Sequence, residues 1–223
     1  VDETGKKMSK VVGNVIDPID LIHGATFEAV VQKALPDAPL AEASKKFKKS
    51  YPSTAEMGTG FEAYGTDALR FTLCSYTPLT KRIPLSPKRI ETNRHFCNKI
   101  WNATRFAMPY LEGATVSASG PPALTTRVNR WLMARLATTL EAYRSGLDNF
   151  RFDESTSALY RFFWGELCDW YLELCKPIFA GDDEALKSET RDTFAYALEA
   201  SLRALHPFMP FITEELWQRL PRP

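Results

Sequence analysis

The stretch SPKRIETNRHFCNKIWNATRFAMPYLEG, residues 86–113, has the pattern of one long amphipathic helix. Ser86 followed by Pro87 is typical of a helix start, because a hydroxyl can cap free amide groups and proline tolerates the first helical position. Apolar side chains and one threonine recur at steps of three and four, which predicts a buried stripe. The stripe consists of Ile90, Cys97, Ile100, Trp101, Thr104, Met108 and Leu111. We therefore expect other helices to pack against this one.

The other face of this helix is polar and basic. Its members, again at helical spacing, are Lys88, His95, Asn98, Lys99, Asn102, Arg105 and Phe106. Residues 81–106 contain seven Lys or Arg against the single acid Glu91, a local excess that attracts a polyanion. Amides can read base edges, and an aromatic ring can stack on a base. We interpret this face as a candidate RNA-reading surface, with a solvated basic face and a buried Phe106 as the alternative.

Composition describes an ordinary globular protein. Of the 223 residues, 44% are hydrophobic and 25% charged, and no apolar run approaches the roughly 18 residues that a membrane span needs. The net charge of +1 is uneven, because residues 1–110 hold 16 Lys or Arg against 11 Asp or Glu, whereas the remainder holds 12 against 16. A nucleic-acid partner is thus expected on the basic half. The chain begins with Val1 in a polar, loop-like segment without a signal peptide, which suggests an excised fragment.

The cysteines and histidines give little sign of a catalytic or metal site. Cys74, Cys97, Cys168 and Cys175 contain no C-x-x-C pair, so we expect no metal site. Cys168 and Cys175, seven apart in a helical pattern, could share a buried face. Reduced core cysteines fit a cytoplasmic protein. None of the three histidines has an obvious Ser or Cys partner for acid–base work.

The segment upstream of Ser86 predicts short helices separated by turns. Asp17 and Pro18 are expected to begin a helix that runs through His23 and ends at Gly24. Further helical segments are expected over residues 26–35 and 41–50.

The second of these segments carries a cluster of lysines, Lys45, Lys46, Lys48 and Lys49. We interpret the cluster as a solvated face, with contact to an RNA backbone as the alternative. Residues 52–60, rich in Ser, Thr and Gly, form a flexible connection. Thr66 or Asp67 is then expected to cap an apolar segment.

Three more helical patterns follow the linker at residues 113–122, and together with the opening helix they predict an antiparallel bundle. They cover residues 128–147, residues from about 153 to Lys176-Pro177, and residues 194–205. A short last helix is expected to be capped by Thr213, with Glu214 and Glu215 in its first turn. The fold class is therefore mainly α.

The chain's first loop carries a specific motif. Lys7-Met8-Ser9-Lys10, followed by GNVIDP at residues 13–18, resembles the KMSKS signature loop of class I aminoacyl-tRNA synthetases. In that family the lysines stabilise the ATP phosphates during amino-acid activation. Val11 stands where the family usually has serine, which puts a polar contact at the end of the loop in doubt and leaves both lysines in register.

Further strings in the same order extend the resemblance over nearly the whole chain. They are GTDALRF from Gly65, the NxxFCNKIWNATRF run from Asn93, FRFDESTSALYRFFW from Phe150, CDWYLELCKP from Cys168, and HPFMPFITEELW from His206. The order is similar to that of the C-terminal half of bacterial-type valyl-tRNA synthetases. The resemblance implies a signature loop and stem-contact segment over residues 1–85, with an insertion at about 32–64, and an anticodon-binding bundle over residues 86–223.

The same resemblance implies roles for individual residues. Lys7 and Lys10 would contact the ATP triphosphate as catalytic residues, with Met8 and Ser9 shaping the ATP-binding loop. The tRNA anticodon would be bound by Lys88, Asn98, Lys99, Asn102, Arg105 and Phe106, with Phe106 as the stacking platform. Lysine at position 88, where the family has an arginine-like residue, loses bidentate geometry.

The resemblance also implies the partners. The full enzyme, cytoplasmic and monomeric, would ligate L-valine to tRNA(Val) using ATP and Mg. The nucleotide-binding core and the editing domain would lie upstream of Val1 and a coiled-coil arm beyond Pro223, so the fragment alone is expected to be inactive and to hold no cofactor.

Two alternatives stay open. One is an isoleucyl-type class I synthetase, which shares the loop and the HPxMPFxTEExW string. The other is a non-catalytic helical RNA-binding module that inherited a synthetase domain.

Overall fold

The computed structural model describes residues 1–55, 60–76, 82–117 and 120–221, and the chain divides into two compact units, Val1–His95 and Phe96–Pro223. The long helix expected at Ser86–Gly113 is present as α5, Pro87–Ala107, and the boundary between the units falls within it. The helix ends earlier than expected, and the chain continues as the short 3₁₀ helix η2, Met108–Tyr110. Pro109 explains this change, because it cannot donate to the α-helical ladder.

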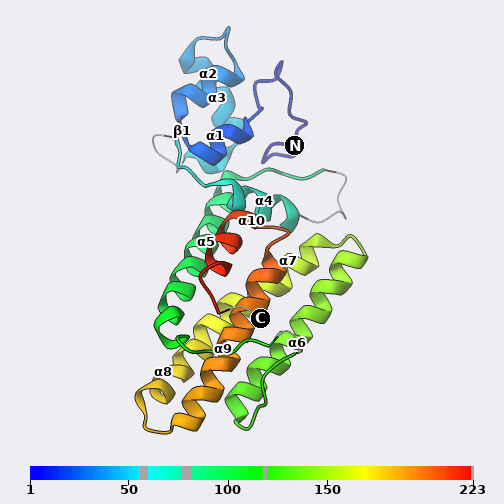
Figure 1. The fold of residues 1–223 in the computed structure, drawn as a ribbon. Helices are drawn as coiled ribbons and strands as arrows, with labels where there is room; N and C mark the ends of the chain where they lie inside the picture. Colours follow the sequence, from blue (N-terminus) through cyan, green and yellow to red (C-terminus); the bar gives the residue numbers. More distant parts are fainter. Residues whose placement is uncertain (56–59, 77–81, 118–119, 222–223) are drawn as a thin grey trace. The chain divides into compact units, whose positions relative to one another are not determined.

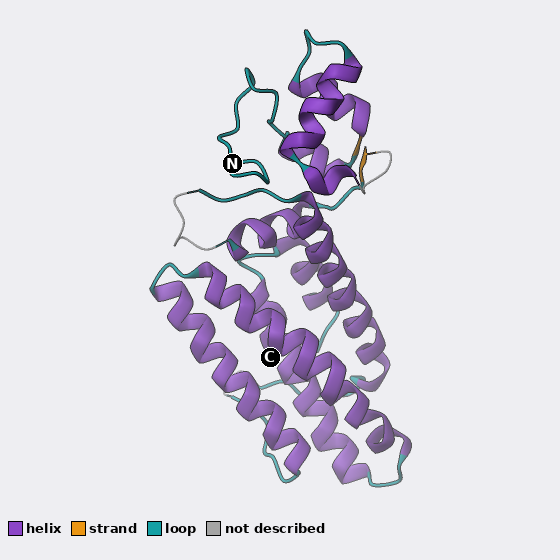
Figure 2. Cartoon of the chain, turned by 180° about the vertical axis from the view of Figure 1, so that it is seen from behind, coloured by secondary structure: helices purple, strands orange, loops and turns teal. Residues whose placement is uncertain are grey.

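The first unit contains short helices around a two-stranded antiparallel sheet (Figures 1 and 2). Its elements are α1 (Pro18–His23), β1 (Ala25–Thr26), α2 (Phe27–Ala34), α3 (Leu40–Ser50), η1 (Pro52–Ala55), β2 (Gly60–Phe61), α4 (Thr66–Ser75) and the start of α5. In the sheet, Ala25 pairs with Phe61 and Thr26 with Gly60. Phe47 and Tyr51, both fully buried, pack with ring centroids 5.0 Å apart and form the centre of this small core.

Two of the helix caps predicted for this unit are present in the structure, and the third prediction is wrong. Asp17 accepts a hydrogen bond from the Ile19 amide at the start of α1, and Gly24 ends the helix with a positive φ of 80°. Helix α4 begins at Thr66 with Gly65 at the N-cap, so neither Thr66 nor Asp67 is the cap. Gly65 has a φ of 83°, a conformation that glycine adopts at no steric cost, and this allows the chain to enter the helix one residue earlier.

The second unit is the expected antiparallel helical bundle, and the mainly α fold class is confirmed. After α5 and η2 come α6 (Arg127–Asp148), α7 (Phe152–Arg161), the π-helix η3 (Phe162–Tyr171), α8 (Leu172–Ala180), α9 (Glu184–Leu205) and α10 (Pro210–Trp217). Figures 1 and 2 show α6, α7 and α9 side by side. Phe162, Phe163 and Leu198 are buried in its core. Of the predicted stripe, Cys97, Ile100, Thr104 and Leu111 are buried here, whereas Trp101 and Met108 are half-buried.

Two details of this bundle correct the sequence-based expectations. The helix expected to end at Lys176-Pro177 continues to Ala180, with Pro177 inside α8. Thr213 is not an N-cap, because α10 begins at Pro210, whose fixed φ and missing amide hydrogen suit the first helical turn. The Thr213 hydroxyl instead donates to the Met209 carbonyl at 2.7 Å and lies 2.9 Å from His206 Nδ1.

Buried cysteines lie on the π-helix and α8, in agreement with the reduced state expected for them. Cys168 and Cys175 are free and buried, and burial raises the pKa of each thiol to about 12. Thiols of this kind are protonated at neutral pH and poorly reactive. They therefore belong to the packing of the bundle.

The start of α6 is held by a polar network centred on Glu189. The carboxylate of Glu189 accepts hydrogen bonds from the Thr126 amide at 3.0 Å and from Asn129 Nδ2 at 2.8 Å, and it also accepts from Thr125. Asn129 Oδ1 in turn accepts a 2.8 Å hydrogen bond from the buried Tyr171 hydroxyl. The network thus joins α6, the π-helix and α9.

Acidification is expected to weaken this network at Glu189. Burial by itself would raise the pKa of Glu189, but hydrogen bonds from Thr125, Asn129 and Thr126 outweigh it and lower the pKa from 4.5 to about 2. A lowered folded-state pKa gives stability that is present above pH 4.5 and is lost as the pH falls toward 2. Glu189→Gln should therefore lower the free energy of unfolding at pH 7 by about 1 kcal/mol and flatten its decline below pH 4.5.

Urea unfolding at pH 7, 4.5 and 3 measures this effect. Glu184→Gln is the matched control, since Glu184 is an exposed acid at the start of the same helix α9. Equal pH profiles for the two variants would show that Glu189 does not act in this way.

Candidate nucleic-acid interface

The loop of residues 7–10 is fixed from beneath by a buried asparagine. Asn14 Oδ1 accepts from the Ser9 amide at 2.9 Å, and Asn14 Nδ2 donates to the Lys7 carbonyl at 3.2 Å and to Asp2 Oδ2 at 2.8 Å. The Tyr51 hydroxyl donates to the Asn14 carbonyl at 2.8 Å and so ties the loop to the core of the first unit. The loop therefore has a defined backbone path.

Asp2 completes this support. Its carboxylate also accepts from the Thr4 amide and hydroxyl and from the Lys6 amide, at 2.7–3.0 Å. Burial alone would raise the pKa of Asp2, but the hydrogen bonds from Asn14, Thr4 and Lys6 together lower it below its ordinary value. Asp2 is thus held as a carboxylate, acting as an acceptor for the loop.

Gly13 closes the loop in a conformation that few other residues could adopt. Its φ is +74°, its amide donates to the Ser9 carbonyl at 3.0 Å, and an added Cβ would lie 2.1 Å from Leu35 Cγ. The resulting turn leaves the side chains of Lys7 and Lys10 exposed. Val11 is 94% exposed, so the residue that departs from the family pattern faces solvent.

In the second unit, one face of α5 presents the predicted RNA-reading residues. Asn98, Asn102 and Arg105 are exposed, and Phe106 is 40% exposed. Asn102 lies four residues after Asn98, and Arg105 and Phe106 lie three and four residues after Asn102, so these side chains share one broad face of the helix. The structure thus brings together two amides, a guanidinium and an aromatic ring, and Phe106 is not a core residue.

Lys99 lies beside this face and already has partners within the bundle. Its Nζ is 3.1 Å from Asp169 Oδ1 and 5.1 Å from the centroid of the Trp164 ring, both on the π-helix. The Lys99 side chain is 31% exposed. An exposed ion pair of this kind contributes about 0–1 kcal/mol, so a phosphate or base could replace it at little cost.

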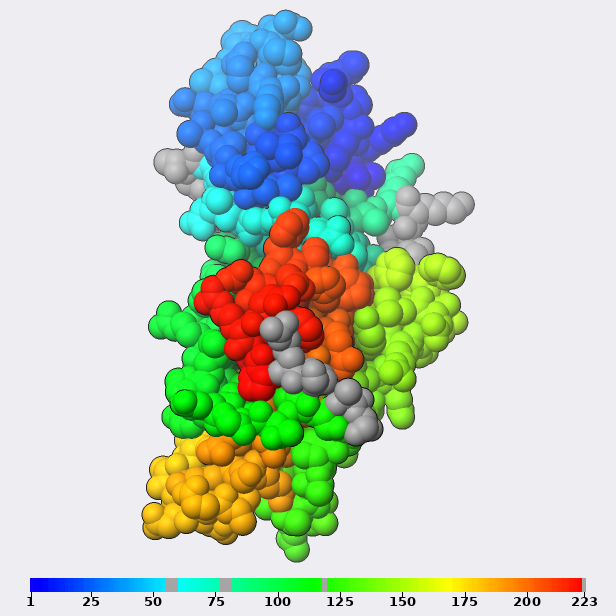
Figure 3. All heavy atoms as spheres, viewed as in Figure 1, coloured from blue at the N-terminus to red at the C-terminus, as the bar shows by residue number. Residues whose placement is uncertain are grey.

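Phe106 lies at the edge of an aromatic cluster. Its ring centroid is 5.4 Å from that of Tyr110, and Tyr110 stacks on Phe179 of α8 at 4.7 Å with an interplanar angle of 18°. The ammonium of Lys176 lies 5.6 Å from the Phe106 centroid. In Figure 3, η2 (green) and the end of α8 (gold) meet at the surface.

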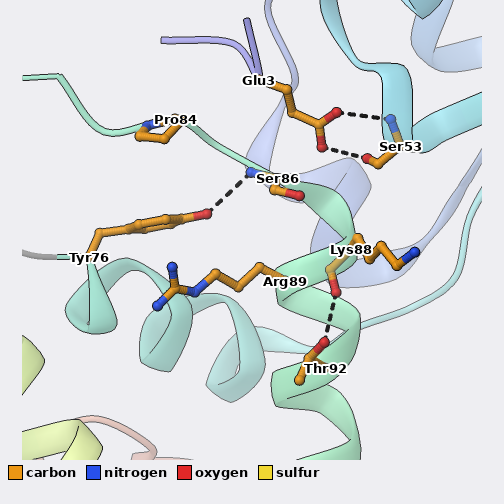
Figure 4. Close-up of a pocket in the computed structure, with 8 residues that line it drawn as sticks. All are labelled: Glu3, Ser53, Tyr76, Pro84, Ser86, Lys88, Arg89 and Thr92. Carbon is orange, nitrogen blue, oxygen red and sulfur yellow. Dashed lines mark hydrogen bonds between the residues drawn. The ribbon is translucent and has the colours of Figure 1, made fainter. Parts of the chain in front are cut away.

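Lys88 lies in the first unit, near the start of α5, and lines a pocket of about 590 Å³ (Figure 4). The pocket is lined by Glu3, Ser53, Tyr76, Pro84, Ser86, Lys88, Arg89 and Thr92. Arg89 extends over the Tyr76 ring at 4.7 Å, and Lys88 extends to the other side of the helix.

The residues that surround the predicted face from other helices were not predicted from the sequence. Lys176 and Phe179 come from α8, Asp169 from the π-helix, and Arg191 of α9 donates from Nε to the Tyr110 carbonyl at 3.2 Å. They are 69 to 81 positions away from the α5 and η2 residues that they contact. The sequence shows charged and aromatic residues after Cys168, but it contains no signal that these residues contact Phe106 or Lys99.

Neither a metal cluster nor a membrane helix is present in the part of the chain that the structure describes. Within residues 1–55, 60–76, 82–117 and 120–221, no group of three or more His, Cys, Asp or Glu could hold a metal ion. No helix in these ranges is both long and apolar enough to cross a membrane.

Two parts of the chain match family models of known proteins. Residues 129–223 match the family model described as the anticodon-binding domain of tRNA ligase. Residues 1–86 match the family model of class I tRNA synthetases (I, L, M and V). The chain therefore contains an anticodon-binding domain, and this domain follows a class I tRNA synthetase family domain.

A solved structure has a similar fold. Agrobacterium radiobacter agnB2 LeuRS, crystallised in a ternary complex with tRNA and LeuAMS, superposes with a TM-score of 0.61 at 19% sequence identity. The match covers 98% of this chain and 21% of the LeuRS chain. The chain thus spans about a fifth of the length of this structural relative, and the likeness concerns the fold.

Proposed function

We propose that the second unit binds the anticodon arm of tRNA(Val) as part of a valyl-type class I synthetase. The observation that carries this proposal is the exposed face formed by Asn98, Asn102, Arg105 and Phe106 in a chain that contains an anticodon-binding domain. Amides supply donors and acceptors for base edges, Arg105 supplies positive charge, and Phe106 supplies a stacking surface. Lys99 adds an ammonium group beside Asn98 and Asn102.

Stacking of a base on Phe106 is worth more free energy than the present cation–π contact of Phe106 with Lys176. Stacking of a base on an aromatic side chain is worth about 1–3 kcal/mol. The cation–π contact of Lys176 with Phe106 at an exposed site is worth about 0.5–1 kcal/mol. A base can therefore replace the ammonium with a net gain.

The loop of residues 7–10 is proposed to serve ATP. Lys7 and Lys10 are exposed on a backbone fixed by Asn14, so their ammonium groups are available to the phosphates of ATP and its Mg ion in a complete enzyme. Met8 and Ser9 are half-buried and shape the loop. Fixed cations placed where negative charge develops stabilise the transition state of pyrophosphate departure. The complete enzyme would ligate L-valine to tRNA(Val) in the cytoplasm as a monomer.

Valine rather than another branched-chain amino acid is supported by two strings. NKIWNATRF from Asn98 and CDWYLE from Cys168 resemble the valyl branch, and Asn98–Phe106 is the segment of α5 that carries the exposed face. An isoleucyl-type synthetase would read a different anticodon on the same kind of surface. The two hypotheses therefore make opposite predictions for tRNA preference.

Transcripts that differ in the anticodon test this choice. We expect the protein to bind a tRNA(Val) transcript about fivefold more tightly than the same transcript carrying an isoleucine anticodon, because the two anticodons differ at the base that pairs with the first codon position, and one lost base-edge hydrogen bond costs on the order of 1 kcal/mol. Filter binding at fixed salt measures the ratio. The reverse preference would favour the isoleucyl type. Anticodon preference without valine-dependent ATP–pyrophosphate exchange in the full-length protein would favour the non-catalytic module.

A further inference from the structure

Lys176 of α8 lies over the ring of Phe106, the residue on which the proposed base would stack. Its Nζ lies 5.6 Å from the Phe106 ring centroid and 2.7 Å from each carboxylate oxygen of Glu173. The side chains of Lys176 and Glu173 are 47% and 58% exposed. Both contacts of the ammonium are therefore at the solvent-exposed surface, where they are easily exchanged.

The surrounding residues fix where this lysine can reach. Phe179, one helical turn after Lys176, stacks on Tyr110, and the Tyr110 carbonyl accepts from Arg191 Nε at 3.2 Å. Tyr110 also contacts Phe106 with ring centroids 5.4 Å apart. The base of the Lys176 side chain is thus held beside Phe106, while its four-carbon stem remains free to turn.

We propose that Lys176 is a phosphate contact for the nucleotide whose base stacks on Phe106. In the free protein the ammonium lies over the Phe106 ring. When a base takes that place, the ammonium turns to the phosphate of the same or the adjoining nucleotide. The inference rests on the proposed anticodon-binding function and adds to it a residue from another helix.

The ammonium of Lys176 and an incoming base compete for the ring of Phe106. An ammonium and a base cannot occupy the same side of Phe106, and stacking is the stronger of the two contacts. A displaced ammonium beside a polyanion gains a phosphate partner and releases a condensed counterion. Glu173 loses its partner at little cost because it is exposed.

Salt-dependent binding of a tRNA(Val) transcript to the full-length protein tests the proposal. A lost phosphate contact reduces the slope of log K against log salt by about 0.7–0.9. For Lys176→Met we therefore expect the loss of affinity between about 50 and 200 mM salt to be about threefold smaller than for the unmodified protein. Lys176→Arg should keep the original slope. Anticodon preference should be unchanged in both variants, because phosphate contacts carry no base information.

Lys187→Met is the matched control. Lys187 forms the same kind of i,i+3 ion pair, with Glu184 at 2.8 Å, on the same unit, and should retain the original slope. A Lys176→Met slope equal to that of Lys187→Met would overturn the proposal. Tighter binding of Lys176→Met at every salt concentration with an unchanged slope would also overturn it, because the lysine would then only compete for the ring. If the unmodified protein shows no anticodon preference, the proposed function itself fails.

Discussion

Replacing Phe106 with alanine is expected to weaken binding of a tRNA(Val) transcript by about 5- to 150-fold, the equivalent of roughly 1–3 kcal/mol of lost base stacking. The ring is 40% exposed, so its removal should change the stability of the bundle far less than it changes binding. Filter binding at fixed salt, with thermal unfolding measured alongside, separates the two effects.

Lys46→Ala provides the comparison for this variant. Lys46 is an exposed cation on α3, paired with Glu42 at 2.8 Å, in the lysine cluster interpreted as a solvated face. Its loss should change binding less than twofold at physiological salt. Equal losses for Phe106→Ala and Lys46→Ala would refute the stacking role and point to general electrostatic binding.

Replacing Lys10 with glutamine is expected to lower kcat for valine-dependent ATP–pyrophosphate exchange by about 10²-fold in the full-length enzyme. The substitution removes a fixed cation from the place where charge develops as pyrophosphate leaves, and such electrostatic contacts typically contribute this much. Because the contact is proposed to strengthen in the transition state, kcat should fall more than the KM for ATP rises.

Lys6→Gln is the control for the loop. Lys6 is an exposed lysine of the same segment, and its backbone amide, which the substitution keeps, donates to Asp2 at 2.9 Å. Its activity should stay within about twofold of the unmodified enzyme, the effect of one screened surface charge. If Lys10→Gln and Lys6→Gln behave alike, the loop does not act through a specific lysine.

Local rules predicted most of the helices correctly. Where a helix start depends on one side chain and its own next turn, as at Asp17, the sequence contains all the information needed. The buried stripe of α5 was also predicted, because the spacing of apolar residues indicates which face of a helix is buried. The predicted caps Thr66 or Asp67 and Thr213 were wrong. Gly65, one to two residues earlier, sets the start of α4, and Pro210, three residues earlier, sets the start of α10.

The predicted helix end at Lys176-Pro177 was wrong for a different reason. Pro177 removes one backbone donor, and by itself this favours a helix end near Lys176. The last turn nevertheless forms, and in it Phe179 stacks on Tyr110 from a distant part of the chain. Packing between elements here outweighs a local preference.

Residues within a few turns of one another are enough to predict the helical pattern, the loop of residues 7–10 and the polar face of α5. The partners of that face depend on tertiary packing. Asp169 beside Lys99 and Lys176 over Phe106 are brought there by packing of the π-helix and α8 in the same unit. Contacts between residues about 70 positions apart depend on how whole helices bury their apolar faces, and no local spacing encodes that choice.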